Sequence, residues 1–198
     1  MQTLAVTKWA RAYPATDGHA HLLRKRVRAY GLRVAPTWEK RIRDEAGSWQ
    51  TLLIEDVLLV PMRDWDGYLW NLQGIFPTKV ETLGRDKDFL LGGRKQGLFF
   101  LIGGIDEAGT LVLVEGYATG CSVHVATGFP VLVCFDCGNL KAVAVEARRR
   151  FPTIDMVIAA DNDTGTPGNP GLRHGREAAL AARARLAFPT FDQEEAAA

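Results

Sequence analysis

The fold class of this chain is indicated by TLVLVEGYATGCSVHVATGFPVLVCF, residues 110–135. It starts as an aliphatic run, turns at Gly116 into a helix-compatible segment, and returns to a second aliphatic run. The alternation continues with NLKAVAVEARRRF, DMVIAAD and GLRHGREAALAARARLAF, which end at residues 151, 161 and 188. Strands that alternate with helices predict a parallel sheet with helices on both faces, and Asn139 is a candidate N-cap of the second helix.

Upstream of this stretch the pattern is different. HAHLLRKRVRAYGL, residues 19–32, predicts an amphipathic helix stopped by Gly31, and β-rich sequence follows from about residue 51. In LLVPMRDWDGYLWNLQGIFP the pair Asp66-Gly67 separates two apolar segments, which predicts a β-hairpin. Glycines at 103, 104 and 109 then interrupt the pattern. We expect a smaller α+β subdomain over residues 1–108 and an α/β domain over residues 109–198.

The charge is nearly balanced overall but uneven along the chain. The formal net charge is +1, yet residues 1–50 carry ten Lys and Arg against four Asp and Glu. This basic part either faces an anionic polymer or forms a solvated helix face with Arg24, Lys25, Arg26 and Arg28. No apolar run approaches the roughly 20 residues of a membrane helix, and the N-terminus lacks the apolar block of a secretory signal. These features predict a cytoplasmic location without membrane contact.

The three cysteines, Cys121, Cys134 and Cys137, indicate a reducing compartment better than a disulfide framework. The segment CFDC has the spacing of a zinc or redox knuckle, but a zinc site needs a second pair of ligands. We therefore favour two small buried side chains over a metal site for this pair.

Three carboxylates follow the predicted strands. Glu115 comes directly after the first strand of the α/β domain, and Asp161 and Asp163 come after the third. In an open parallel sheet, functional groups collect beyond the carboxyl ends of the strands. Side chains two residues apart on extended backbone point the same way, so Asp161 and Asp163 can share a hard cation. Oxygen ligands of this kind suit Mg²⁺ or Mn²⁺, and Gly116 lets the backbone and a substrate come close.

These residues carry a resemblance. LVEGYATG followed by IAADND resembles the Toprim catalytic domain of DNA primases and topoisomerases, whose pattern is one glutamate and then D-x-D. EGYATG is similar to the E-G-Y-A-T-A signature of primases carried by conjugative plasmids and satellite phages, and GNL, TPGNPG and KDFLLGGRKQGLFFLIG also resemble that group. The likeness covers most of the chain. It departs at Gly120, where the signature has alanine.

The resemblance implies a Toprim-like, Rossmann-type parallel sheet and a nucleotidyl-transfer centre. In that centre Glu115 acts as acid/base or metal ligand, while Asp161 and Asp163 hold Mg²⁺ or Mn²⁺. The implied activity is primer synthesis from nucleoside triphosphates on a single-stranded DNA template. The chain lacks a zinc-binding template module and a P-loop signature, so we expect it to be a fragment or to depend on a helicase or a flanking template-binding domain.

Other residues are weaker candidates. Asp136 and Asn139 follow the second strand and can contact metal-bound water or nucleotide, or simply start a helix. The expected phosphate- or DNA-binding cations are Lys87, Arg94 and Lys95, in a glycine-containing loop, and Arg173, which with His174 opens the last helix. Tyr117 is expected to pack rather than stack on a base, and Trp65 and Trp70 either stack on bases or belong to a hairpin core.

Three alternatives stay open beside the primase. The same carboxylates can assist attack by water, which gives a nuclease or nicking enzyme. DNDTGT superficially resembles the nucleophile motif of haloacid dehalogenase-type phosphatases, although residue 165 is glycine where that motif needs threonine. The third alternative is a nucleic-acid-binding replication module with little turnover of its own.

Overall fold

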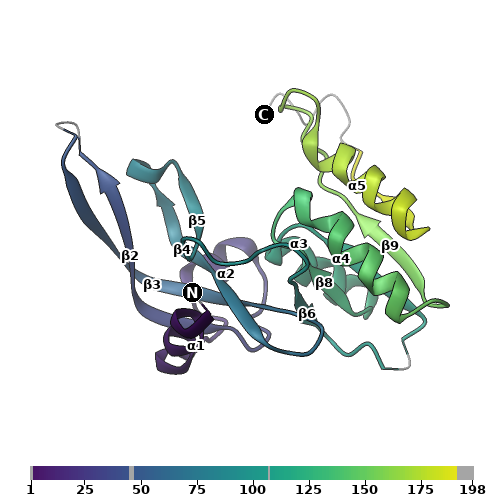
Figure 1. Ribbon diagram of the computed structural model, residues 1–198, viewed down its shortest axis with the longest axis horizontal. Coiled ribbons are helices and arrows are strands. Elements are labelled where there is room, and N and C mark those ends of the chain that lie inside the picture. Colours follow the sequence, from purple (N-terminus) through teal and green to yellow (C-terminus); the bar gives the residue numbers. More distant parts are fainter. Residues whose placement is uncertain (1, 45–46, 107, 191–198) are drawn as a thin grey trace. The chain divides into compact units, whose positions relative to one another are not determined.

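The computed structural model describes residues 2–44, 47–106 and 108–190, and the chain divides into two compact units, Met1–Lys95 and Gln96–Ala198 (Figure 1). The sequence predicted a boundary between residues 108 and 109. The division comes earlier because strand β6 (Phe100–Ile102) pairs with β8 (Val131–Val133) and so belongs to the second sheet. The glycines from residue 103 onward therefore interrupt the second unit.

The N-terminal unit is an antiparallel sheet in the order β1-β2-β3-β4-β5 with two helices. A core cluster of buried apolar side chains, which includes Trp38, Val57, Leu72 and Phe76, holds the helix α1 against the strands. The elements in chain order are α1 (Gln2–Arg11), β1 (Tyr13–Pro14), α2 (Ala20–Lys25), β2 (Arg33–Arg43), β3 (Trp49–Arg63), β4 (Leu69–Val80), the 3₁₀ turn η1 (Glu81–Leu83) and β5 (Arg85–Phe89).

The predicted hairpin is present. β3 and β4 run antiparallel, with Leu58 opposite Ile75, and the connection contains Gly67 at φ +82°. The carboxylate of Asp64 accepts hydrogen bonds from the backbone N–H groups of Asp66 and Tyr68, at 3.1 and 3.0 Å, and so fixes the turn. The glycine supplies a left-handed backbone conformation that other residues adopt only with strain.

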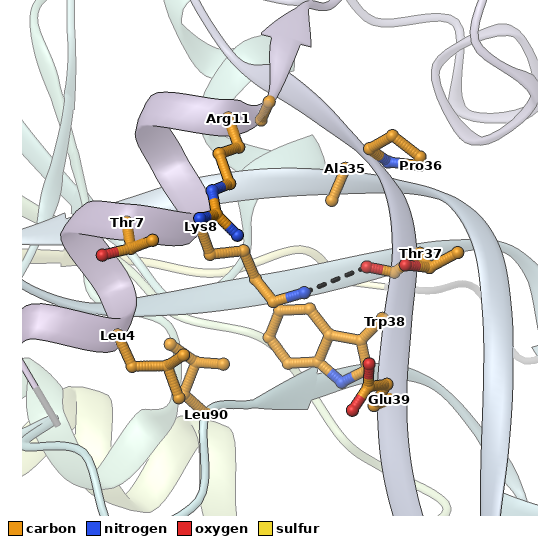
Figure 2. Close-up of a pocket in the computed structure, with 11 residues that line it drawn as sticks. Leu4, Thr7, Lys8, Arg11, Ala35, Pro36, Thr37, Trp38, Glu39 and Leu90 are labelled. Atoms are coloured by element: carbon orange, nitrogen blue, oxygen red, sulfur yellow. Dashed lines mark hydrogen bonds between the residues drawn. The ribbon is translucent and has the colours of Figure 1, made fainter.

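The helices of this unit differ from the prediction. The helix expected over residues 19–31 covers only Ala20–Lys25, because Arg26 takes a left-handed conformation (φ +54°) and ends it six residues earlier than expected. The helix α1 was not predicted. Its Lys8 ammonium donates to the carbonyl of Thr37 at 3.0 Å and lies 5.3 Å from the centre of the Trp38 ring, beside a cavity of about 490 Å³ (Figure 2).

The C-terminal unit has a sheet in the order β10-β9-β7-β8-β6. All neighbouring pairs are parallel except β6 with β8. This is the predicted α/β fold. The elements after β6 are β7 (Thr110–Val114), α3 (Tyr117–Thr127), β8 (Val131–Val133), α4 (Cys137–Arg150), β9 (Asp155–Ala159), α5 (Pro170–Ala182) and β10 (Arg185–Ala187).

Helices cover both faces of this sheet. From β7 the chain crosses through α3 to β8 on one side, then returns through α4 to β9 on the other side. Right-handed crossovers in opposite directions place α3 on one face and α4 with α5 on the other. The side-by-side α4 and α5 are visible in Figure 1 and are joined by Arg148, whose guanidinium donates to the carbonyl of Ala182 at 2.8 Å. The residues Leu111 to Val114 of β7 are buried, as a strand covered on both faces requires.

Two details of this unit depart from the sequence prediction. The last predicted helix is shorter, since Arg183 adopts a left-handed conformation (φ +50°) and the chain then forms the edge strand β10. At Gly120 the helix α3 approaches the sheet closely. A Cβ there would lie 2.9 Å from a methyl carbon of Val133 and 3.2 Å from one of Val114. The glycine at the one position where the signature has alanine therefore affects packing as well as helix propensity.

Within the described ranges, none of the helices has the length and apolar character needed to cross a membrane.

Candidate active site

The site is defined by the point where the sheet reverses its winding. β8 lies on one side of β7 and β9 lies on the other, so the connections that leave β7 and β9 diverge to opposite faces. In open α/β sheets such a switch point opens a crevice beyond the carboxyl ends of the two strands. Val114 pairs with Ala159 across the switch point. Glu115 and Asp161 therefore follow the ends of neighbouring strands.

Glu115 occupies the central position. It is half-buried, directly follows β7, and precedes Gly116, the N-cap residue of α3, whose carbonyl accepts the N–H of Gly120 at 3.0 Å. A helix N-terminus stabilises nearby negative charge. Burial, followed by the charges of Glu115 and Asp136, raises the pKa of the Cys137 thiol. The negative charges of Glu115 and Asp136 therefore both reach the region at the ends of β7 and β8.

Asp161 and Asp163 lie in the loop between β9 and α5, and both are half-buried. Asp163 does not continue the strand. Its N–H donates to the side-chain oxygen of Asn169 at 3.0 Å, and its own carboxylate accepts the N–H of Gly171 at 3.1 Å. The first turn of α5 thus holds Asp163. Asp161 borders an apolar groove of about 410 Å³, lined by Thr119, Val123, Ala159, Ala160, Ala187, Phe188 and Pro189.

Asn169 and Gly171 are residues whose role the sequence did not reveal. Asn169 adopts a left-handed conformation (φ +42°) and caps α5 by accepting the N–H of Leu172 at 3.3 Å. A Cβ on Gly171 would lie 2.7 Å from the carbonyl oxygen of Asp161 and 2.8 Å from the carboxylate of Asp163. From the sequence, the segment TPGNPG had no role beyond its resemblance to the family pattern. It lets α5 start directly against the D-x-D loop.

The carboxylates of Glu115, Asp161 and Asp163 supply the oxygen ligands that a hard divalent cation prefers. These residues also follow the ends of adjacent strands. Their side chains are not gathered into a formed cluster. In the part of the chain that the structure describes, no group of three or more His, Cys, Asp or Glu side chains is close enough together to hold a metal ion. The close convergence of Glu115, Asp161 and Asp163 expected from the sequence is thus absent there, and one reason is that Asp163 turns toward Gly171.

Asp136 and Asn139 have structural roles that differ from the prediction. The N-cap of α4 is Asp136, whose carboxylate accepts the N–H of Asn139 at 3.0 Å. Asn139 is buried, donates to the carbonyls of Leu98 and Cys134, both at 2.8 Å, and accepts the N–H of Gly97 at 2.7 Å. Its amide is thus engaged in joining the segment before β6 to the end of β8, and it is not the cap.

The cations expected to bind phosphate are all exposed. Lys87 lies on β5, paired with Ile75, instead of in the predicted loop. The guanidinium of Arg94 lies 5.3 Å from the centre of the Trp70 ring, and the ammonium of Lys95 lies 4.7 Å from that of Phe89. These two loop cations are therefore held by aromatic rings of the N-terminal unit.

The remaining candidates have mixed environments. Arg173 is on the first turns of α5. Its guanidinium lies 3.8 Å from the carboxylate of Glu177 and 3.2 Å from the imidazole Nε2 of His174. Tyr117 is buried, and the centre of its ring lies 5.9 Å from that of Phe100, as expected of a core residue. Trp70 donates to the carboxylate of Asp64 at 2.6 Å, and its ring is partly buried in the hairpin.

A family model described as a Toprim domain matches residues 110–192, which begin at β7 and contain all three carboxylates. The C-terminal unit thus matches a Toprim domain over most of its length. Two proteins named DNA primase TraC, both from Escherichia coli, are 38% identical over 139 residues and 35% identical over 143 residues. These matches cover 67% and 69% of this chain, and they confirm the resemblance to Toprim primases of the plasmid type.

The chain spans only 12% and 10% of the lengths of these two relatives. Solved structures share the fold at low identity. A DNA primase domain from Pseudomonas aeruginosa aligns with a TM-score of 0.59 at 13% identity, over 97% of this chain and 72% of that one. The RNA polymerase domain of primase DnaG from Mycobacterium tuberculosis also gives 0.59, at 16% identity, over 96% and 74%. The folds of these two domains are therefore similar to that of this chain over almost its whole length.

Proposed function

We propose that the chain is the catalytic module of a DNA primase and synthesises short primers on single-stranded DNA from nucleoside triphosphates. The observation that carries this proposal is the position of Glu115 at the end of β7, next to the strand that leads to Asp161, in a chain that is 38% identical to a DNA primase over 139 residues. This chain spans only 12% of that relative, so the activity, substrates and partners proposed here are those of the module alone.

Each acidic residue has a proposed role. Asp161 and Asp163 hold Mg²⁺ or Mn²⁺, which supplies positive charge to the transferring phosphate. Glu115 accepts the proton of the attacking 3′-hydroxyl, at a strand end where the N-terminus of α3 stabilises negative charge. The new bond joins the 3′-oxygen to the α-phosphorus, and the bond from that phosphorus to the pyrophosphate leaving group breaks. One carboxylate oxygen of Asp163 already accepts the N–H of Gly171. Only the remaining lone pairs of this carboxylate are available to an ion.

Basic residues supply the proposed contacts to template and nucleotide. Lys87, Arg94 and Lys95 are exposed on the N-terminal unit and suit phosphate groups of a template strand. Arg173 is exposed near the start of α5, on the same helix that holds Asp163, and suits the phosphates of a nucleotide. A helicase or a flanking template-binding domain is a further proposed partner, consistent with relatives about six to seven times as long.

The test is incorporation of labelled nucleotide on circular single-stranded DNA with Mg²⁺ or Mn²⁺. Wild type is compared with Glu115→Gln and Asp161→Asn, and we expect both variants to lose at least 100-fold in rate, as for removal of a catalytic acid/base or metal ligand. Asp155→Asn is the matched control, because Asp155 starts β9 at the opposite end of the strand that leads to Asp161. It should remain active.

The same assay distinguishes the alternatives. Loss of an end-labelled strand without incorporation would replace the primase with a nuclease. Binding of DNA without either reaction would leave a replication accessory module. Full activity of Glu115→Gln or Asp161→Asn would remove that residue from the site.

A further inference from the structure

The hairpin of β2 and β3 continues beyond the core of its sheet as an arm, which we define as residues 39–43 and 49–53 (Figure 1). β3 pairs with β4 only from Leu58 onward, whereas its pairing with β2 extends to Trp49 opposite Arg43. Trp38 and Ile54, at the base of the arm, still belong to the buried core. Past them Leu52 still packs against this core, but the other side chains of the arm are not members of it.

The two faces of the arm differ. On one face Lys40 lies 2.8 Å from the carboxylate of Asp88, and Leu52 packs against the core cluster. Residues that alternate with these point the other way. This outer arm face consists of six exposed side chains: Glu39, Arg41, Arg43, Trp49, Thr51 and Leu53. Its aliphatic and aromatic members are not buried by the fold, since Trp49 is 57% and Leu53 is 59% exposed.

Arginine and tryptophan are combined at the distal part of this face. The guanidinium carbons of Arg41 and Arg43 each lie 4.9 Å from the centre of the Trp49 ring. Neither arginine forms an ion pair with a carboxylate of the described residues, in contrast to Lys40 on the opposite face. Two cations stabilise the orientation of the indole while leaving more than half of it open to solvent. The fold thus holds an exposed flat ring next to two fixed positive charges.

We infer that the outer arm face binds single-stranded DNA, with an unpaired base stacked on Trp49 and phosphates on Arg41 and Arg43. Proteins that hold single strands without sequence preference combine exposed aromatic rings with a basic track in this way. Glu39, the one acidic member of the outer arm face, lies at its base, and the carboxylate of Asp44 beyond the distal end accepts the N–H of Ser48 at 2.8 Å. The choice of DNA as the partner rests on the proposed function; the choice of a single strand rests on the exposed ring, which a paired base cannot stack upon.

The experiment measures binding of a 5′-labelled oligonucleotide of mixed sequence to the full chain by fluorescence anisotropy, in EDTA and at several salt concentrations. Trp49→Ala should weaken binding about tenfold, the effect of losing one stacked base. Trp49→Phe keeps a ring and should retain most of the affinity. Arg41→Ala combined with Arg43→Ala should weaken binding and make the slope of log affinity against log salt shallower by about 1.4, since each phosphate contact to a single strand contributes about 0.7.

Matched controls come from exposed residues elsewhere. Tyr68 is 62% exposed beside the β3–β4 turn, and Arg149 is exposed on α4, so Tyr68→Ala and Arg149→Ala should bind as wild type does. Wild-type affinity of Trp49→Ala, or equal affinity for a duplex of the same length, would overturn the inference. Failure of the proposed function looks different: the wild type would bind the oligonucleotide through the arm and yet incorporate no nucleotide when Mg²⁺ or Mn²⁺ is supplied.

Discussion

Val114 lies opposite Ala159 in adjacent parallel strands, and this pairing sets Glu115 and Asp161 at neighbouring strand ends on the two sides of the switch point. The sheet fixes the backbone positions of the acidic residues, while their side chains are not gathered into a cluster in the described part of the chain. A cation at the proposed site would therefore have to draw the side chains together. We expect this rearrangement to lower the affinity of the site for metal.

This expectation predicts a small thermal stabilisation by Mn²⁺. With a dissociation constant near 1 mM, 10 mM Mn²⁺ should add about 1.4 kcal/mol to the free energy of unfolding of the C-terminal unit. The gain should vanish in Asp161→Asn and persist in Asp155→Asn. Calorimetry with Mn²⁺, and with Ca²⁺ for comparison, measures it. Identical melting of wild type with and without Mn²⁺ would remove the proposed metal site.

Gly171→Ala should reduce activity while leaving most of the fold in place. The added Cβ would lie 2.7 Å from the carbonyl oxygen of Asp161, a backbone atom that cannot rotate away, so the D-x-D loop must move relative to α5. A displacement of about 1 Å can cost roughly 100-fold in rate. Nucleotide incorporation measures the effect, and circular dichroism checks that the helices persist. Gly165→Ala is the control, because nothing lies within 4 Å of a Cβ at that position of the same loop; equal activity of both variants would contradict the argument.

The fold of the C-terminal unit could be predicted because its strands are short aliphatic runs separated by helix-compatible segments, as in TLVLV before Gly116. The sequence did not predict where two helices end, because these ends depend on backbone conformations that the residue types do not indicate. Arg26 and Arg183 both end a helix in the left-handed region, where glycine is the usual residue. The expected stop at Gly31 was therefore too late, and β10 was merged into a helix.

The candidate site could be predicted only as far as strand ends. Alternation along extended backbone suggested that Asp161 and Asp163 share an ion, but the chain turns after β9 and Asp163 binds the first turn of α5. Asn139 follows the second predicted strand and opens a helix-compatible run, which suggested a cap. Its burial and its contacts with Leu98 and Gly97 depend on a segment some 40 residues earlier, and no local pattern reveals such contacts.

Asn139→Ala should destabilise the C-terminal unit by about 3 kcal/mol. The change leaves the N–H of Gly97 and the carbonyls of Leu98 and Cys134 without their partner, and each buried unpaired group costs about 1–3 kcal/mol. Asp136→Ala removes only a helix cap and should cost about 1 kcal/mol. Denaturation followed by circular dichroism compares the two variants. A loss of nucleotide binding by Asn139→Ala without a change in stability would favour a direct role in the site.

Gly120→Ala should destabilise the same unit even though alanine favours helix. The gain in helix propensity is about 1 kcal/mol, and overpacking against the methyl groups of Val133 and Val114 costs about 1–3 kcal/mol. We expect a net loss of about 1 kcal/mol, recovered in part when Val133→Ala is added, because the smaller side chain makes room for the new methyl group. A thermodynamic double-mutant cycle measures this coupling. Strictly additive effects would show that the helix shifts without strain.

His21 should make the N-terminal unit sensitive to acid. Its side chain is 1% exposed, and burial, followed by the charge of Arg24, lowers the pKa of the imidazole to about 4 from the usual 6.5. Lys87 and Lys25 lower this pKa further and Asp86 raises it. The unfolded chain takes up a proton near pH 6.5 while the folded unit stays neutral, so stability is complete above pH 6.5 and is lost as the pH falls toward about 4.

The loss attributable to His21 should approach about 3 kcal/mol at pH 4. All five tryptophans lie in the first 70 residues, so their fluorescence follows unfolding of this unit alone in the full chain. His21→Gln keeps an acceptor for the Arg24 guanidinium, which contacts the imidazole at 3.1 Å, but does not titrate. Urea denaturation at pH 7, 5.5 and 4 should show a steeper decline for wild type than for His21→Gln. Parallel declines would mean that His21 takes up its proton equally in the folded and unfolded states.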